Sequence, residues 1–542
     1  MKRTALLLLL SAIGCSTSSS KPVAPPPAVA LTPTPGIASR LNPNVIEETE
    51  TYYIERLPKA DYILVDDRHV RSPIVMAPIE FFKQDADYYY ISVAKTLPEE
   101  RAAARMSQPA APRSAAPAAP AAKSTEAVPA VPLSDFSDLS PARVASPIRL
   151  EEVRDAGLPQ KGMWRASFVV ADMNADGIPD LVAPPPRMTD GRLRVWLNDG
   201  KGHFTEWPLS YTENGAPRQY FSIDYGGVAV ADIDHDGHAD IVCASHGAGL
   251  VSLFGDGRGG FTIVRAGLPG KEFSSQAVAL VDARGNGKFV AVASRDIPPE
   301  QTPGKPADLT QVRVFDFLGR QKGWEFLKEG IVGGPFSHSL AAWDYDGDGR
   351  QDVLTGNHWA GQLRVLWKSN GDGTFSLVPI PVLEAQAFHL TAVPGTFGKG
   401  RSRAFADSYE MQTSVPEVTR AAGITVYTFQ DGTWERHRLW RQKNPKASVY
   451  GLAMGDMDGD GLDDVVFADS ERHRLRILLQ RPDGSFEEIA EESEPALDSP
   501  GQWIRLADLN GDGRLDVIVS KTVTASNPNE NGGWSVYLNR AK

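Results

Sequence analysis

Residues 456–464 read Asp456-Met-Asp-Gly-Asp-Gly-Leu-Asp-Asp464, and this stretch decides the fold of the chain. Carboxylates occupy positions 1, 3, 5 and 9 of the loop, and Gly461 at position 6 permits a sharp turn. Ca²⁺ takes about six to eight oxygen ligands, so carboxylates at this spacing can surround one ion. We therefore expect a calcium loop with Asp456, Asp458, Asp460 and Asp464 as side-chain ligands.

The residues on either side of this loop predict strands. An EF-hand would close on a Glu at about position 12 and lie between two helices. Here the flanks are short apolar segments, 449–454 before the loop and 465–468 after it. Segments of this length and composition are typical of β-strands. The loop is therefore expected to join two strands.

The same pattern recurs along the chain, at 172–180, 232–240, 344–352 and 508–516. Two further copies, at 277–293 and 389–406, keep the strand-turn-strand outline without the acids. Together the copies define seven units spaced 50–62 residues apart, and about five bound Ca²⁺ ions are expected. The predicted ligands in the four additional loops are Asp172, Asn174, Asp176, Asp180, Asp232, Asp234, Asp236, Asp240, Asp344, Asp346, Asp348, Asp352, Asp508, Asn510, Asp512 and Asp516.

These units resemble the FG-GAP/VCBS repeats of integrin-α-like β-propellers, over about residues 148–542. Each unit also carries an apolar segment followed by a Gly-rich turn, as at 193–204, which predicts a second hairpin and four strands in all. The resemblance implies an all-β, seven-bladed propeller whose metal loops join the first and second strands on one rim, away from ligand. The last unit ends on a third strand at 533–538, so residues 148–154 should complete it.

The first residues predict export. Lys2 and Arg3 precede an apolar run at 4–13 that is too short to span a bilayer, so residues 1–14 are expected to be a signal peptide. The stretch Ala12-Ile-Gly-Cys15 resembles a bacterial lipobox, which implies a diacylated Cys15 and a lipid anchor in the cell envelope, at the outer membrane because Ser16 follows the cysteine. The alternative is ordinary secretion with cleavage at another position.

Composition divides the rest of the chain. Residues 15–42 and 107–134 are rich in Pro, Ala and Ser, so we expect a tether and a linker. Between them, residues 43–106 predict a small, mostly β domain with a hairpin turning at 84–87 and a helix from Leu97. Residues 135–542 are expected to form the propeller. Cys243 has no partner for a disulfide and is expected to be a buried thiol.

The charge excludes nucleic acid as a partner. The chain has 56 basic and 68 acidic residues, a net charge of −12, and many of the acids belong to the repeated loops. The membrane is expected to be reached only through the lipid anchor. The expected partner is an envelope or extracellular protein or glycan.

The spacing of the units points to the rim opposite the metal loops. The longer units carry insertions after the second strand, at 184–191, 295–308 and 407–416. The ligand-binding candidates on that rim are His246, His338, His358, Trp359, His389, Tyr450 and Trp503. The histidines could instead ligate a transition metal, and the aromatic residues could instead pack in the walls of the central channel.

Two classes of function follow. The sequence contains no zinc-protease, nucleophile-elbow or phosphate-loop motif, which favours a binding, adhesion or assembly module over an enzyme. The alternative is an enzyme acting on polysaccharide, with Arg295, His338, His358 and Tyr409 gathered at one point on the rim opposite the metal loops. The fold alone does not decide between them.

Overall fold

The computed structural model describes seven short strands between residues 45 and 94, and then residues 136–541 except 188–190, 220, 296–310, 359–363, 385–386, 413–419, 444–447 and 524–530. The chain divides into two units, Met1–Lys123 and Ser124–Lys542. The segments predicted as signal peptide, tether, helix from Leu97 and most of the linker lie outside the described residues.

The first unit contains two small antiparallel sheets, with strand orders β1-β2-β7-β6 and β3-β4-β5. The hairpin predicted around 84–87 is confirmed, because β6 pairs with β7. The strands are β1 (Val45–Glu48), β2 (Tyr52–Pro58), β3 (Ile63–Asp66), β4 (His69–Arg71), β5 (Met76–Pro78), β6 (Phe82–Gln84) and β7 (Tyr88–Ala94).

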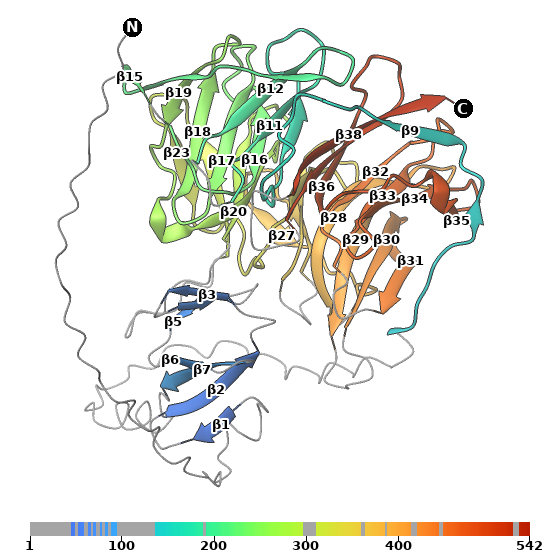
Figure 1. Ribbon diagram of the computed structural model, residues 1–542. Coiled ribbons are helices and arrows are strands. Elements are labelled where there is room, and N and C mark those ends of the chain that lie inside the picture. Colours follow the sequence, from blue (N-terminus) through green and yellow to red (C-terminus); the bar gives the residue numbers. More distant parts are fainter. Residues whose placement is uncertain are drawn as a thin grey trace, which may run out of the picture. The chain divides into compact units, whose positions relative to one another are not determined.

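The second unit is a seven-bladed, all-β propeller, as predicted (Figure 1). Blade 1 contains β10 (Val169–Ala171), β11 (Asp180–Ala183), β12 (Arg194–Asn198) and β13 (Phe204–Glu206), and blade 2 contains β16 (Val228–Ala231), β17 (Asp240–Ser245), β18 (Gly249–Gly255) and β19 (Gly260–Val264). Blade 3 contains β20 (Ser275–Val281), β21 (Val290–Arg295), β22 (Val312–Phe317) and β23 (Trp324–Leu327), and blade 4 contains β24 (Leu340–Trp343), β25 (Asp352–Thr355), β26 (Leu366–Ser369) and β27 (Phe375–Leu377).

Blades 5 to 7 contain β28 (Ala387–Phe397), β29 (Ser402–Gln412), β30 (Arg420–Gln430), β31 (Thr433–Lys443); β32 (Leu452–Gly455), β33 (Asp464–Asp469), β34 (Arg474–Gln480), β35 (Phe486–Ile489); and β36 (Gly501–Ala507), β37 (Asp516–Lys521), β38 (Gly533–Ala541). Short 3₁₀ turns lie at Lys271–Phe273 and Glu491–Ser493.

The four strands of blade 5 have 11 residues each. Residues 407–412, predicted as part of an insertion, therefore belong to β29 because the hairpin ladder continues through them.

Blade 2 carries an addition that the repeat pattern did not predict. The segment between blades 1 and 2 forms β14 (Ser210–Glu213) and β15 (Ala216–Arg218), and β14 pairs in parallel with β19. The blade becomes a six-stranded sheet with the order β15-β14-β19-β18-β17-β16. These strands carry few apolar residues, which explains why periodicity gave no signal for them.

A strap before the first blade closes the ring (Figure 1). Phe136 is buried against Tyr409 and Met411 of blade 5. Next, β8 (Arg143–Val144) pairs in parallel with β35 of blade 6, and β9 (Ile148–Glu152) pairs antiparallel with β38. The prediction that residues 148–154 complete the last blade is thus confirmed. The pairing covers an edge strand that would otherwise expose unpaired backbone groups.

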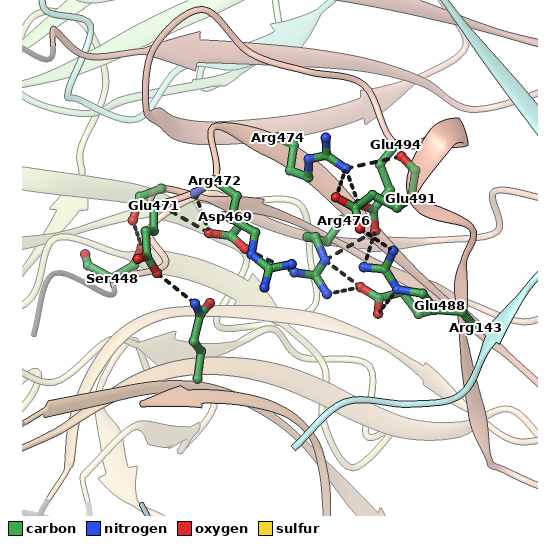
Figure 2. A network of polar contacts seen from close by, with 12 residues as sticks. Arg143, Ser448, Asp469, Glu471, Arg472, Arg474, Arg476, Glu488, Glu491 and Glu494 are labelled. Atoms are coloured by element: carbon green, nitrogen blue, oxygen red, sulfur yellow. Dashed lines mark hydrogen bonds and ion pairs between the residues drawn. The ribbon is translucent and has the colours of Figure 1, made fainter. Parts of the chain in front are cut away.

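A buried ion network fastens the strap to blade 6 (Figure 2). Arg143 contacts Glu488 at 3.2 Å and Glu491 at 3.1 Å. Arg476 also contacts Glu488, and it lies 3.1 Å from Asp469 and 3.2 Å from Glu494. The side chain of Arg476 is only 4% exposed. The network therefore links residues that lie more than 300 positions apart in the sequence.

The hydrophobic cores lie between neighbouring blades. The cluster between blades 7 and 1 contains Trp164, Trp196 and Trp534, with ring centroids of Trp164 and Trp534 5.1 Å apart. Cys243 is fully buried between blades 1 and 2 as a free thiol, as predicted. Among the described residues, no helix has the length and apolar composition needed to cross a membrane.

Candidate functional site

The five acidic loops share one backbone geometry. In each, the first Asp accepts backbone N–H groups from the far side of its own loop; Asp172 accepts Gly177 at 2.8 Å and Asp456 accepts Gly461 at 2.9 Å. Gly461 has a φ of +86°, and a Cβ at this position would meet no atom within 4 Å, so backbone conformation and not crowding selects glycine there. Each loop joins the first and second strands of its blade, as the repeat resemblance implied.

The ninth residue of each loop is a fully buried Asp with a structural role. In blade 6, Asp464 accepts the N–H of Met457 at 2.8 Å and that of Gln480, on the third strand, at 2.8 Å. The other four loops repeat both bonds. Burial raises the pKa of Asp464 to about 8 and that of Asp240 to about 7. A nearby cation would favour the ionised form of these carboxyl groups.

Three of the loops bring acids close enough to share a metal ion. In each group, ligand atoms from three carboxylates lie within 4.8 Å of one another. The groups are Asp232, Asp234 and Asp240; Asp344, Asp346 and Asp348; and Asp456, Asp458 and Asp460. The all-oxygen donor set suits a hard cation such as Ca²⁺. Asp352 and Asp464, predicted as ligands, are not part of these groups, whereas Asp240 is.

The loops of blades 1 and 7 have an Asn at position 3 and fold in the same way. Asp508 accepts the N–H of Asp512 at 3.1 Å and that of Gly513 at 2.8 Å. Asn510 accepts the N–H of Asp512 at 3.0 Å. Metal binding by these two loops, and by Asp236, Asp352 and Asp464, stays a prediction.

Basic side chains already contact several loop acids. Arg320 contacts Asp234 and Asp236, and Lys368 contacts Asp346 and lies 3.1 Å from Asp348. These contacts show that the carboxylate groups attract cations. Each contact is partly exposed to solvent, so its energetic contribution is small. A divalent ion would compete with these side chains for the same oxygens.

The two copies that lack the full set of loop acids, in blades 3 and 5, confirm the strand-turn-strand prediction. In blade 3, Asp282 still accepts the N–H of Asn286 at 3.1 Å and that of Gly287 at 2.8 Å. Val290 begins β21 in the place of the buried ninth Asp. In blade 5 the hairpin of β28 and β29 continues without a loop of this kind. The backbone turn therefore forms without the full set of carboxylates.

A cluster of basic and aromatic side chains lies at the opposite end of the blades, where second strands end and first strands begin. The rings of His338 and His358 have centroids 4.2 Å apart. His246 stacks on Tyr225 at 4.7 Å, and the Arg187 guanidinium lies 5.1 Å from the Tyr225 ring centroid. Of the predicted candidates, His246, His338 and His358 thus come to one rim. We call this rim the channel mouth.

Two histidines of the channel mouth are held neutral. Burial lowers the pKa of His338 well below its usual value, and the neighbouring basic groups His358, Arg165 and His246 lower it further. Burial likewise lowers the pKa of His358 to about 4. Tyr450 is half-buried near this group, and its pKa is raised by burial and by Glu410. The mouth therefore offers neutral imidazoles beside permanently charged arginines.

Other predicted candidates occupy different positions. His389 is fully buried, and its Nδ1 lies 2.7 Å from Asp407 Oδ2 within blade 5. Trp503 is 4% exposed in the core between blades 7 and 1 and donates a hydrogen bond to the Arg165 carbonyl at 2.8 Å. It belongs to the channel wall, the alternative raised by the sequence. Trp359 and most residues of the predicted insertions lie outside the described residues.

The four residues proposed for an enzyme do not form one group. Tyr409 is 1% exposed and packs with Phe136 and Met411. Arg295 is 3% exposed, and its guanidinium lies 5.0 Å from the Phe273 ring centroid. Of these four residues, only His338 and His358 are joined by a ring contact in the part of the chain that the structure describes. Their arrangement does not favour the enzyme alternative.

A cavity of about 320 Å³ follows the propeller axis. Residues in the first strands, or up to two positions before them, line it from all seven blades, including Ser167, Gly227, His338, Thr391 and Arg505. None of the described residues that line it is acidic. The volume lies at the lower end of the range of small-molecule sites, which is about 300–1,000 Å³.

Sequence reasoning missed four residues of the mouth and channel: Arg165, Arg187, Tyr225 and Arg505. Each comes from a different strand or blade, and none belongs to a repeated motif. The sequence held a partial signal for Arg505, because it is the one charged residue in its first strand, Gly501–Ala507. Only the folded ring shows that these side chains share one space.

Comparison with known proteins agrees with the repeat architecture. A model described as an FG-GAP-like repeat matches residues 172–243 and 456–519. No curated protein matches the chain. Among solved structures, BBS1N in complex with ARL6DN aligns with a TM-score of 0.43 and 10% identity, covering 73% of this chain and 98% of that one. A protein from Lactobacillus plantarum aligns with a TM-score of 0.42 and 13% identity, covering 64% and 89%. The match to the repeat model and the observed blades together show that the chain contains FG-GAP-like repeats in a seven-bladed β-propeller.

Proposed function

We propose that the propeller is a binding module that captures an envelope or extracellular protein or glycan at the channel mouth. The observation that carries this proposal is the separation of two chemistries: carboxylate loops at one end of the blades, and arginine, histidine and tyrosine side chains at the other. Aromatic and arginine side chains offer large contact areas with polar ends, which suits a recognition surface.

The acidic loops have a structural role in this proposal. They hold about five Ca²⁺ ions, one in each loop with a complete pattern, and each ion neutralises carboxylates that would otherwise repel one another. The three carboxylate groups of blades 2, 4 and 6 support this assignment. Affinities of about 10⁻⁴–10⁻³ M, as in extracellular modules, are expected.

The N-terminal sequence supports a lipid anchor at the outer membrane. Residues 1–14 would direct export and be removed, and Cys15 with the Pro-rich segment 16–42 would tether the folded parts to the envelope. Replacing Cys15 by Ser and fractionating cells tests the anchor. The variant should leave the membrane fraction; if it stays there as the wild type does, the lipid anchor is wrong.

Binding itself is tested on panels of glycans and envelope proteins at a saturating Ca²⁺ concentration. His358→Ala and Tyr225→Ala alter the channel mouth, and His203→Ala, an exposed residue in a turn at the metal-loop end, is the matched control. Mouth variants should lose capture of the ligand that wild type and control retain, with unfolding midpoints that change little. Equal capture by all variants would contradict the proposed surface.

A further inference from the structure

The channel behind the mouth contains Arg505, a cation for which the described residues supply no carboxylate partner. Arg505 lines the cavity, donating one hydrogen bond to Ser167 Oγ at 2.6 Å and one to the carbonyl of Ile504 at 2.8 Å. A guanidinium has five N–H donors, so these two bonds do not use its capacity. Burial lowers the pKa of Arg505 to about 10, and no charged neighbour opposes this effect.

The walls around Arg505 hold its planar group in place. Its guanidinium carbon lies 5.4 Å from the Phe168 ring centroid and 5.8 Å from that of Trp503. Both rings belong to the core between blades 7 and 1, so they are fixed by packing. Cation–π contacts of this kind restrict a guanidinium without neutralising its charge. Arg505 is therefore positioned before any ligand arrives.

Three acids on the mouth side of blades 5 and 6 have basic partners. Glu410 pairs with Arg420, Asp407 with His389, and Asp469 with Arg476. The titratable groups that act on His338 at the inner end of the mouth are all basic, namely His358, Arg165 and His246, and Arg165 is the permanent cation among them. Arg165 loses its usual solvation there, since burial lowers its pKa. The channel behind the mouth thus combines neutral imidazoles with the charges of Arg165 and Arg505, and no carboxylate is among the described residues that line the cavity.

We propose that the axial channel binds a small oxyanion, a carboxylate or phosphate on a molecule of about monosaccharide size, with its charge against Arg505. An arginine fork pairs with two oxygens of such a group, and burial strengthens the pair because water no longer screens it. His338 and Ser167 provide polar contacts beside it. The inference rests on the proposed function, because it names the chemistry that the binding module recognises.

The test is isothermal titration of the calcium-loaded protein with D-galacturonate, D-galactose 6-phosphate and the neutral sugar D-galactose. At least one oxyanion should bind with a dissociation constant in the millimolar range or tighter, and galactose at least tenfold more weakly. The first two probes separate a carboxylate ligand from a phosphate ligand. If neither oxyanion binds at 50 mM, or if galactose binds equally well, the inference is wrong.

Three variants locate the binding. Arg505→Gln removes the charge from the channel, and Arg258→Gln removes the same charge from an exposed turn between β18 and β19. Arg505→Gln should weaken oxyanion binding at least tenfold, Arg258→Gln less than twofold, and Arg505→Lys should restore part of the loss. Equal binding by Arg505→Gln and wild type would overturn the assignment. Unfolding midpoints of all three variants show whether the fold is retained.

The two proposals can fail separately. If the oxyanions do not bind while His358→Ala and Tyr225→Ala still lose the envelope ligand, the channel inference fails and the proposed function stands. If oxyanions bind through Arg505 while the mouth variants capture every envelope ligand normally, the proposed binding surface fails and the channel site stands.

Discussion

Blade 6 gathers carboxylates at both of its ends, and the two groups differ in the protein cations that lie beside them. At one end, Asp456, Asp458 and Asp460 lie close together, and Arg481 reaches only Asp458, at 3.4 Å. At the other end of the same strands, Asp469, Glu488, Glu491 and Glu494 are matched by Arg143, Arg474 and Arg476 (Figure 2). The loop leaves uncompensated charge for a metal ion, whereas the network supplies its own cations.

This difference predicts which end depends on solution conditions. Carboxylates paired with buried arginines keep their partners whatever the free metal concentration. A loop whose carboxylates rely on Ca²⁺ stabilises the folded protein only to the extent that its metal site is occupied. The following variants are chosen to separate the two contributions.

The largest effect is expected from Arg476→Ala. This change leaves Glu488, Glu494 and Asp469 buried without their shared cation, and their side chains are 2% exposed or less. Removing one partner of a buried pair costs about 3–5 kcal/mol. Urea unfolding should show this loss equally in Ca²⁺ and in EDTA. A loss that appears only in Ca²⁺ would mean that the network and the loop are not independent.

Asp460→Asn should produce a smaller loss that depends on metal. The amide oxygen can still accept the N–H of Leu462, now bonded to Asp460 at 2.9 Å, so the turn is kept. At about 10 mM Ca²⁺ and the expected affinities, one site contributes about 1.4–2.7 kcal/mol. In EDTA the variant should match wild type within about 0.5 kcal/mol, because no ion is bound in either protein.

Blade 3 provides the control for this loop variant, because Asn286 already stands at position 5 of its turn and accepts the N–H of Lys288 at 3.0 Å. Asn286→Asp should not create a calcium-dependent gain in stability, since position 3 of that loop is Arg284 and position 9 is Val290, which leaves Asp282 as the one other acid. A gain equal to the loss in Asp460→Asn would show that carboxylates at positions 1 and 5 suffice to hold the ion.

Arg143→Ala should cost about 1 kcal/mol or less in either buffer, because solvent screens a partly exposed pair. Its side chain is 32% exposed where it contacts Glu488 and Glu491. Because Arg143 fastens β8 to blade 6, hydrogen exchange should rise in residues 143–152 before it rises elsewhere in the propeller. Unchanged exchange there would show that the strap is held by its backbone pairing alone.

The smallest effect is expected from Asn510→Asp in blade 7. The new carboxylate adds charge to a loop that has three acids, which should tighten Ca²⁺ binding and raise stability in Ca²⁺ by less than about 1 kcal/mol. In EDTA the added repulsion should lower stability slightly. Chelation of the wild type should release Ca²⁺ from the blade 1 and blade 7 loops first; release from blade 6 first would reverse this ranking.

The sequence predicted the metal-loop end because its information is local and repeated. Nine consecutive residues specify each loop, and five copies make the period visible, so the propeller and its closing strand followed from the printed chain. The channel mouth and the ion network lack this property. Arg143 meets Glu488, and Trp503 meets Arg165, across more than 300 residues. Such contacts arise from ring closure, which no single repeat encodes.

Single-residue roles were harder to predict than the fold for the same reason. Histidine and tryptophan are common in binding sites, yet His389 and Trp503 are both buried. His389 lies beside Asp407, and Trp503 lies in the interface between two blades. Arg505 resembles a surface residue in the sequence, yet it lines the axial cavity. The difference between these residues lies in which face of a first strand they occupy and how neighbouring blades cover it.

The most direct test of the metal-loop account is calorimetric titration of the metal-free propeller with Ca²⁺, for the wild type and Asp460→Asn. The account predicts about five bound ions in the wild type and one fewer in the variant, together with an unfolding midpoint that rises with Ca²⁺. Absence of binding heat and of any midpoint shift, or the same stoichiometry in both proteins, would contradict it.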